Sequence, residues 1–223
     1  MVMPKPREIF NSLPTRDDWF KIVNKADDAP AEIYLYDEIG YWGTTAAAFV
    51  QQLKDLDTDA INVFISSRGG DIFDGIAIYN ALRSHGATIT TQVDALAASI
   101  ASVIVQAGDH RIMLTASQMM IHEAHGIAIG SAPDMRDYAA ILDKQSDIIA
   151  GIYAERSGGS AEHFRDLMAA ETWMDSTEAV EQGLADEGVK PESKADIDDD
   201  VGTKNGLDWS DFIASTELEL EKI

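Results

Sequence analysis

The chain has 223 residues, of which 45% are hydrophobic and 25% charged, which is typical of a globular protein with room for one substantial core. Asp and Glu outnumber Lys and Arg by 39 to 17, and the formal net charge of −22 leaves no general basic face for nucleic acid. The sequence has no cysteine, which excludes disulfides, thiol nucleophiles and cysteine metal sites.

Apolar residues are not clustered as a membrane protein requires. No run approaches the roughly 18 apolar residues of a membrane span, and the N-terminal residues lack the apolar core of a signal peptide. We therefore expect a cytoplasmic protein that has neither membrane nor nucleic-acid partners.

Composition divides the chain into three parts. Residues 1–30 form a polar arm whose one apolar piece, residues 19–23, is either a short strand or a docking segment. Residues 31–190 form the predicted domain. Residues 191–223 form an acidic extension, in which 207–223 has the pattern of an amphipathic helix. The charge runs near the ends are typical of solvated surface.

Strands and helices alternate in the first half of the domain. The pattern predicts strands over 32–36, 61–65 and 87–93, and helices from Thr44 through Leu53, from Ile72 to about His85 and from Ile100 to Ala107. Such β-α-β-α order predicts a mainly parallel sheet with functional groups at the carboxyl ends of its strands.

The second half has shorter strands and one long helix. We expect strands over 111–114, 119–122 and 171–174, an extended glycine-flanked segment over 125–130, and helices over 134–156, from Ser160 to about Met168 and over 176–180. No internal repeat is present.

Ser99 falls where the strand 87–93 and its turn lead into the helix that starts at Ile100. Backbone N–H groups at such a helix start can stabilise an oxyanion, although a serine at such a turn is more often only a helix N-cap. Ser102 lies one helical turn further on, and we expect it to serve packing.

Three distant segments resemble motifs of one family. They are residues 67–70 (Ser-Arg-Gly-Gly, followed by a helix containing Gly75), residues 97–101 (Ala-Ala-Ser-Ile-Ala) and residues 120–122 (Met-Ile-His). A fourth segment, residues 178–186, matches the stretch that follows the catalytic acid of that family. Over residues 30–190 the chain thus resembles ClpP, the proteolytic subunit of the Clp protease. The resemblance implies an α/β fold, the ClpP/crotonase-like superhelix of repeated β-β-α units, in which residues 134–156 are a protruding handle helix.

The resemblance also implies a serine endopeptidase without cofactor or metal. Ser99 is then the nucleophile, His122 the general base and Glu171 the acid that follows in the chain, with Asp175 as the alternative acid. Backbone N–H groups of Gly69 or Gly70 and of Ile100 form the oxyanion hole. We expect the neighbouring His125 to be structural.

Partners follow from the same resemblance. It implies protein or peptide substrates and a homo-oligomer of stacked rings, heptameric in the family. The chain departs from the family at Glu123-Ala124, where a proline is usual, at Ala101, in its longer N-terminal arm and in its acidic extension. With these departures the chain resembles the ClpP-related proteases that mature phage and prophage heads. This resemblance implies a capsid or scaffold protein as partner and the host cytoplasm or prohead as location.

Three other functions stay open. One is a housekeeping Clp subunit that works with a AAA+ chaperone. Another is a crotonase-type acyl-CoA enzyme, which needs a carboxylate base such as Asp71 or Asp74. The third is an inactive ring subunit.

Overall fold

The computed structural model describes residues 20–23, 30–40 and 46–190. The chain divides into two units, residues 1–190 and 191–223, and all described residues belong to the first. The predicted helix over 207–223 and the predicted cap Thr44 lie outside the described residues.

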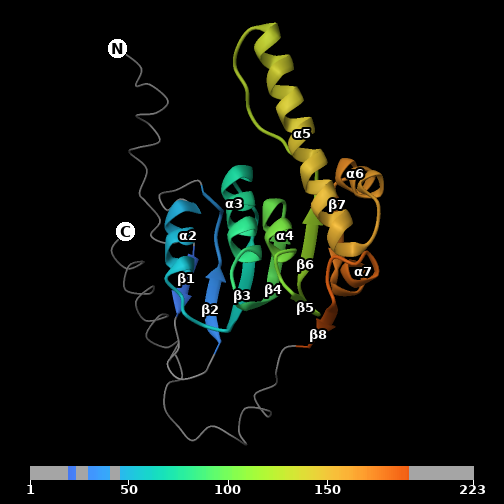
Figure 1. Ribbon diagram of the computed structural model, residues 1–223. Helices are drawn as coiled ribbons and strands as arrows, with labels where there is room; N and C mark the ends of the chain where they lie inside the picture. Colours follow the sequence, from blue (N-terminus) through green and yellow to red (C-terminus); the bar gives the residue numbers. More distant parts are fainter. Residues whose placement is uncertain (1–19, 24–29, 41–45, 191–223) are drawn as a thin grey trace, which may run out of the picture. The chain divides into compact units, whose positions relative to one another are not determined.

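The centre of the unit is an eight-stranded mixed sheet (Figure 1). Its main path runs β1 (Phe20–Val23), β2 (Ala31–Leu35), β3 (Ala60–Ser67), β4 (Thr88–Ala98), β5 (His110–Leu114) and β8 (Glu187–Val189). The far end of β4 pairs with β6 (Gln118–Ile121), which in turn pairs with β7 (Thr172–Asp175). All these pairings are parallel except those of β1 with β2 and of β7 with β6. The predicted α/β fold is confirmed.

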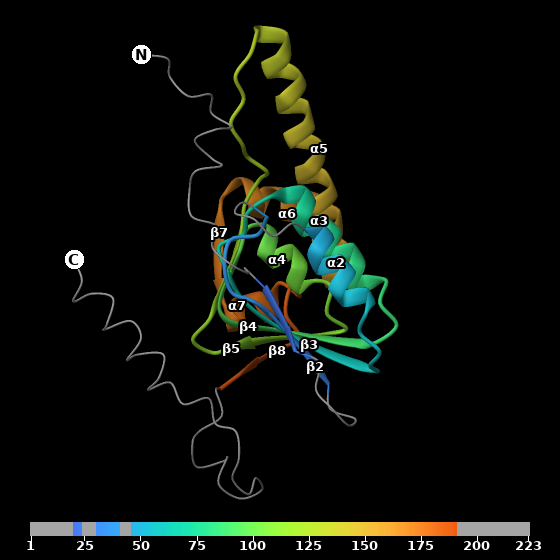
Figure 2. The same cartoon turned by 90° about the vertical axis from the view of Figure 1, so that its left-hand side faces the viewer.

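Three helices lie side by side on one face of the sheet: α2 (Ala46–Lys54), α3 (Ile72–Arg83) and α4 (Ile100–Val105) (Figure 2). Side chains alternate along β3, so that Ile61, Val63 and Ile65 are fully buried while their neighbours are partly exposed. Every residue of α4 is buried. The core is therefore continuous around the short helix that begins directly after Ser99.

Gly75 sets the distance between α3 and α4. A Cβ built at Gly75 would lie 2.2 Å from Cγ1 of Ile100, closer than any real contact. The missing side chain thus allows α3 to pack on the first residue of α4, and this contact helps to fix the position of Ser99.

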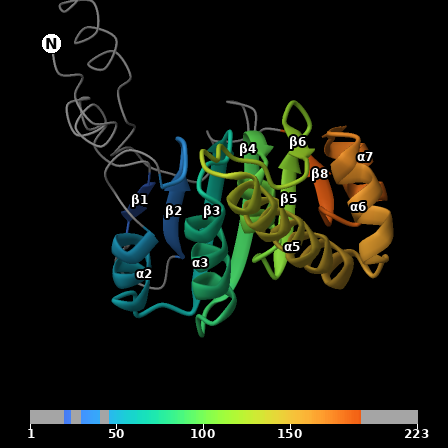
Figure 3. The ribbon, with the colours of Figure 1, turned by 90° about the horizontal axis from the view of Figure 1, so that it is seen from above.

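Helix α5 (Ala132–Ser157) extends beyond the rest of the unit (Figures 1 and 2). Seen from above, it crosses in front of β4 (Figure 3). Its start is fixed by a capping box between Ser131 and Asp134, and it ends at Gly158 in the left-handed conformation. Its buried residues all lie in the second half, from Ser146 to Tyr153, where α6 (Ala161–Ala169) packs against it. No helix among the described residues is long and apolar enough to cross a membrane.

Two elements differ from those predicted. Strand β4 continues to Ala98, five residues beyond the predicted end, because its last residues pair with β6 from Leu96↔Gln118 to Ala98↔Met120. Strand β8 was not predicted, because it has only three residues and pairs with β5, which is distant in the sequence. Residues 20–23 form the edge strand β1, which is one of the two alternatives predicted for this apolar piece of the arm.

Candidate active site

Ser99 occupies a strained turn between β4 and α4. Its φ of 56° and ψ of −130° are unusual for a residue with a side chain. The backbone is held on both sides, because the Ser99 N–H donates to the Met120 carbonyl at 2.9 Å and the Ser99 carbonyl accepts from the N–H of Ser102 at 3.0 Å and from its hydroxyl at 2.5 Å. Within the described residues, the non-glycine residues with positive φ are Ser99 and Glu171, and such strain is concentrated at functional sites.

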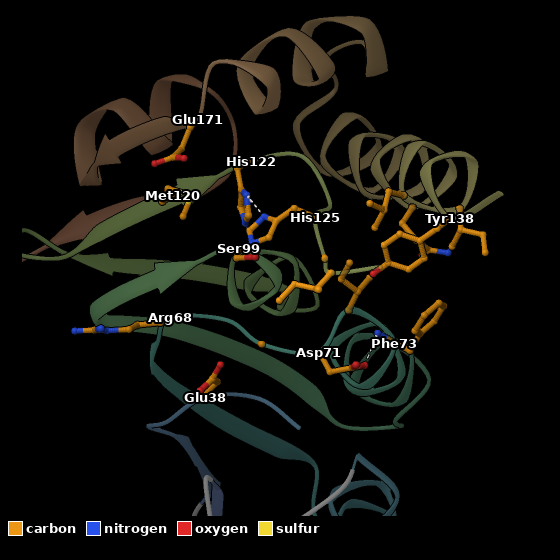
Figure 4. A pocket seen from close by; sticks show the side chains of 17 residues that line it. Glu38, Arg68, Asp71, Phe73, Ser99, Met120, His122, His125, Tyr138 and Glu171 are labelled. Atoms are coloured by element: carbon orange, nitrogen blue, oxygen red, sulfur yellow. Dashed lines mark hydrogen bonds between the residues drawn. The ribbon is translucent and has the colours of Figure 1, made fainter. Parts of the chain in front are cut away.

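His122 follows β6 immediately, and the parallel pairing of β6 with β4 carries it to Ser99. Its Nε2 lies 2.7 Å from Ser99 Oγ (Figure 4). Burial lowers the pKa of the His122 imidazole, and His125 lowers it further, while the negative charge of Glu171 acts in the opposite direction. The net effect favours the neutral imidazole, which is the form that can accept a proton from the serine.

Glu171 lies opposite His122 because the antiparallel register of β6 and β7 pairs Ile121 with Thr172. Its N–H donates to the Met168 carbonyl at 3.1 Å, and the same carbonyl accepts from the N–H of Glu123 at 3.2 Å. One acceptor therefore ties together the segments that follow His122 and precede β7. The Glu171 carboxylate accepts from the indole Nε1 of Trp173 at 3.3 Å.

Asp175, the alternative acid, has another task. Its Oδ1 accepts from the N–H groups of Thr177 and Glu178 at 2.8 and 2.9 Å, and it forms the capping box that starts α7 (Ser176–Glu181). Asp175 does not line the cavity in front of Ser99, whereas Glu171 does. Of the two candidate acids, Glu171 is the one whose charge acts on His122.

The glycine pair after β3 comes close to Ser99. A Cβ on Gly69 would lie 2.7 Å from the Ser99 Cβ and 3.2 Å from the Ile100 nitrogen. The Gly69 N–H already donates to Ser67 Oγ at 3.1 Å. The N–H of Gly70 has no acceptor in the described part of the chain. Gly70 is thus the member of the pair whose N–H is available.

A cavity of about 620 Å³ lies in front of Ser99, and Figure 4 shows its walls. Glu38 and Arg68 lie on one side of the serine, and Phe73 and Tyr138 on the other. The remaining lining residues include Ile72, Met120, Ile127, Ile141 and Leu142. Ser99 thus faces a cavity that is charged on the side of Glu38 and Arg68 and mainly apolar, apart from Asp71, on the side of Phe73 and Tyr138.

Asp71 and Asp74 are the carboxylates that a crotonase-type reaction would need. Asp71 lines the cavity, but its Oδ1 caps α3 by accepting from the N–H groups of Phe73 and Asp74 at 2.9 and 3.0 Å. Burial and the charge of Asp71 raise the pKa of Asp74, which does not line the cavity. Among the described residues, neither carboxylate is hydrogen-bonded to an imidazole, whereas the Ser99 hydroxyl contacts His122 Nε2.

His125 also belongs to the site, although the sequence suggested a structural role for it. Its Nδ1 lies 3.1 Å from the Nδ1 of His122, and it lines the same cavity. The sequence offered only one signal, a second histidine three residues after the first.

Comparisons with known proteins agree with the geometry. The family model described as "Clp protease" matches residues 15–192. The chain is 32% identical over 164 residues to an ATP-dependent Clp protease proteolytic subunit of Bacteroides fragilis, an alignment that covers 69% of this chain and 79% of that protein. It is also 32% identical over 148 residues to the ATP-dependent Clp protease proteolytic subunit 2 of Chlamydia trachomatis, covering 66% and 73%. The chain therefore belongs to the Clp protease family and is a serine-type peptidase.

Proposed function

We propose that the chain hydrolyses peptide bonds in protein substrates, with Ser99 as the nucleophile and His122 as the general base. The observation that carries this proposal is the 2.7 Å contact between Ser99 Oγ and His122 Nε2 at a strained strand-to-helix turn. As Oγ attacks the scissile carbonyl, its proton passes to Nε2. The imidazolium then gives that proton to the leaving amine, and water repeats the sequence on the acyl-enzyme.

The oxyanion of the tetrahedral intermediate needs donors beside Ser99. The N–H groups of Gly70 and Ile100 are suited to this role, because the Gly69 N–H already donates to the Ser67 hydroxyl. The turn also brings the glycine pair against the start of α4. Glu171 supplies the negative charge that favours the imidazolium of His122. An oxyanion donor of this kind contributes on the order of 100-fold or more to kcat.

The test is covalent labelling with a fluorophosphonate, which reacts only with an activated serine. We expect the wild type to be labelled and Ser99→Ala to be unlabelled, and both to be checked for cleavage of casein or a short peptide. Ser84→Ala is the matched control, because Ser84 is exposed at the end of α3 and does not line the cavity. Labelling that persists in Ser99→Ala would show that another residue is the nucleophile.

We also propose that the chain works as a homo-oligomer of stacked rings. Ile127 and Ile129, in the extended segment before α5, are 91% and 95% exposed, and Ile141 and Ile148 on α5 are 48% and 42% exposed. Exposed large apolar side chains on a protruding helix and on the segment that leads into it are typical of an interface. Native mass spectrometry tests this proposal. An exclusively monomeric protein would refute it.

The specific role that we propose is maturation of a phage or prophage head. It is supported by Glu123 and Ala124 after the histidine, by the Glu-Thr-Trp acid segment and by the acidic extension. The purified protein should cleave the capsid or scaffold protein encoded beside its gene. A housekeeping Clp subunit would instead leave that protein intact and degrade folded substrates faster when a AAA+ chaperone is added.

A further inference from the structure

The Nδ1 atom of His122, on the side of the ring away from Ser99, contacts a second imidazole. The distance from His122 Nδ1 to His125 Nδ1 is 3.1 Å, and the two rings are 4.5 Å apart between centroids and inclined by 51° (Figure 4). The two nitrogens thus lie within hydrogen-bonding distance with the rings tilted rather than stacked. A neutral imidazole can be both donor and acceptor, so one ring can donate to the other.

The backbone before His125 is anchored on two helices. The Glu123 N–H donates to the Met168 carbonyl of α6 at 3.2 Å, and the Ala124 N–H donates to the hydroxyl of Ser146 on α5 at 3.0 Å. Ser146 is only 2% exposed. Arg165 adds an ion pair to Glu123 at 3.1 Å. These contacts hold the chain that presents His125, although its ring is exposed to the cavity.

The direction of the hydrogen bond follows from the contact with Ser99. A general base needs the lone pair of His122 Nε2 to face Ser99 Oγ, so the proton of the neutral ring is on Nδ1. That Nδ1–H then donates to His125 Nδ1, whose own proton is on its Nε2. His125 thereby selects the tautomer of His122 that can take the proton of the serine.

We propose that His125 is a positioning residue of the peptidase, which orients His122 through a direct hydrogen bond to its Nδ1. The inference rests on the proposed function. During acylation the Ser99 proton moves to His122 Nε2, the Nδ1 proton stays on His122, and the lone pair of neutral His125 accepts from the imidazolium. No proton is transferred to His125, and the later transfer from Nε2 to the leaving amine restores the starting state.

Glu171 has a separate effect on the same ring. Its carboxylate accepts from Trp173 Nε1 at 3.3 Å and influences His122 through its charge. The work that a single carboxylate does in a Ser-His-Asp triad is thus divided here, with orientation assigned to His125 and charge to Glu171.

Two variants separate orientation from packing. His125→Leu removes the acceptor, and we expect kcat and the rate of fluorophosphonate labelling to fall by roughly 10²-fold while KM stays nearly constant. His125→Asn keeps an acceptor oxygen at the δ position and should recover most of that loss. His163→Asn is the control, because His163 is an exposed histidine on α6 outside the cavity.

Nitrogen NMR of ¹⁵N-histidine-labelled protein reads the tautomer without any turnover. We expect the His122 ring to carry its proton on Nδ1 in the wild type and in Glu171→Gln, and to become a mixture of tautomers in His125→Leu. A fixed Nδ1–H tautomer in His125→Leu, or labelling of that variant at the wild-type rate, would overturn the inference and leave the serine peptidase in place. A wild type that is never labelled would refute the proposed function, whereas the NMR result would still decide the role of His125.

Discussion

Replacing Gly69 by alanine should disable Ser99 without unfolding the protein. The new Cβ would lie 2.7 Å from the Ser99 Cβ and 2.8 Å from the Ala98 carbonyl oxygen, where ordinary contact begins at 3.4 Å. Neither neighbour is the end of a flexible side chain, so the glycine loop or the turn at Ser99 must move by several tenths of an ångström. A displacement approaching 1 Å in a catalytic group costs about 100-fold in rate. We expect a loss of that order in kcat/KM.

Backbone strain must be separated from this displacement. Gly69 has a φ of +96°, and an L-residue in that region costs about 1–2 kcal/mol. Gly158→Ala is the matched control, because Gly158 has a φ of +76° at the end of α5 and a Cβ there would meet nothing within 4 Å. Both variants should lose free energy of unfolding in urea through backbone strain, and Gly69→Ala should lose more because its Cβ also meets its neighbours, but only Gly69→Ala should lose activity.

The assay is therefore a pair of measurements on each variant, the rate of fluorophosphonate labelling and the free energy of unfolding. Equal labelling rates for the Gly69 and Gly158 variants would show that the close approach of the glycine loop does not position the serine. Gly70 would then lose its support as an oxyanion donor, because its position beside Ser99 depends on the same close approach.

Three further outcomes are expected. Glu171→Gln removes the charge that raises the pKa of His122, so the acidic limb of kcat/KM should move to lower pH, because the neutral base then persists further into acid; a limb that moves upward would contradict the assignment. Tyr153→Phe deletes a fully buried hydroxyl that lies 2.8 Å from a serine hydroxyl of α4, and urea unfolding should show a loss of about 1 kcal/mol with kcat unchanged. Burial alone would raise the pKa of Asp186, but hydrogen bonds from the buried Arg111 lower it overall. The ion pair therefore stabilises the fold above the ordinary pKa of 3.8, and this stabilisation is lost as the pH falls below that value. Asp186→Asn should therefore cost about 1–2 kcal/mol at neutral pH, because Arg111 loses its counter-charge but keeps its hydrogen bonds to Gln106 and Gly183, and it should flatten the loss of stability in acid.

The elements of the first half could be predicted from periodicity, because each strand and helix buries its own apolar pattern. The helix predicted from Ile72 to about His85 ends at Arg83, with Ser84 as its C-cap. The strand predicted over 61–65 lies within β3. The extension of β4 to Ala98 could not be predicted, because the alanines there pair with residues 22 positions further along the chain, Ala97 with Met119 and Ala98 with Met120. Likewise, nothing in the local sequence indicates that the Gly69 N–H donates to the Ser67 hydroxyl.

The contact between His122 and His125 could not be predicted for a related reason. Nothing in the spacing of two histidines three residues apart fixes whether their rings meet, since that depends on the anchoring of the segment to Met168 and Ser146. The positive φ of Glu171 is equally invisible in the sequence, and it arises where the chain turns from α6 into β7.

Strand β6 is the element that joins these separate pieces. Its parallel pairing with β4 places His122, which follows the strand, beside Ser99. Its antiparallel pairing with β7 places Glu171 opposite His122. Because side chains alternate along a strand, a slip of one residue in either pairing would turn the imidazole away from the serine or the carboxylate away from the imidazole. The strand has only four residues, so the register depends on its buried side chains, Met119 and Ile121. Two apolar core positions thus help to set the geometry of the proposed catalytic groups.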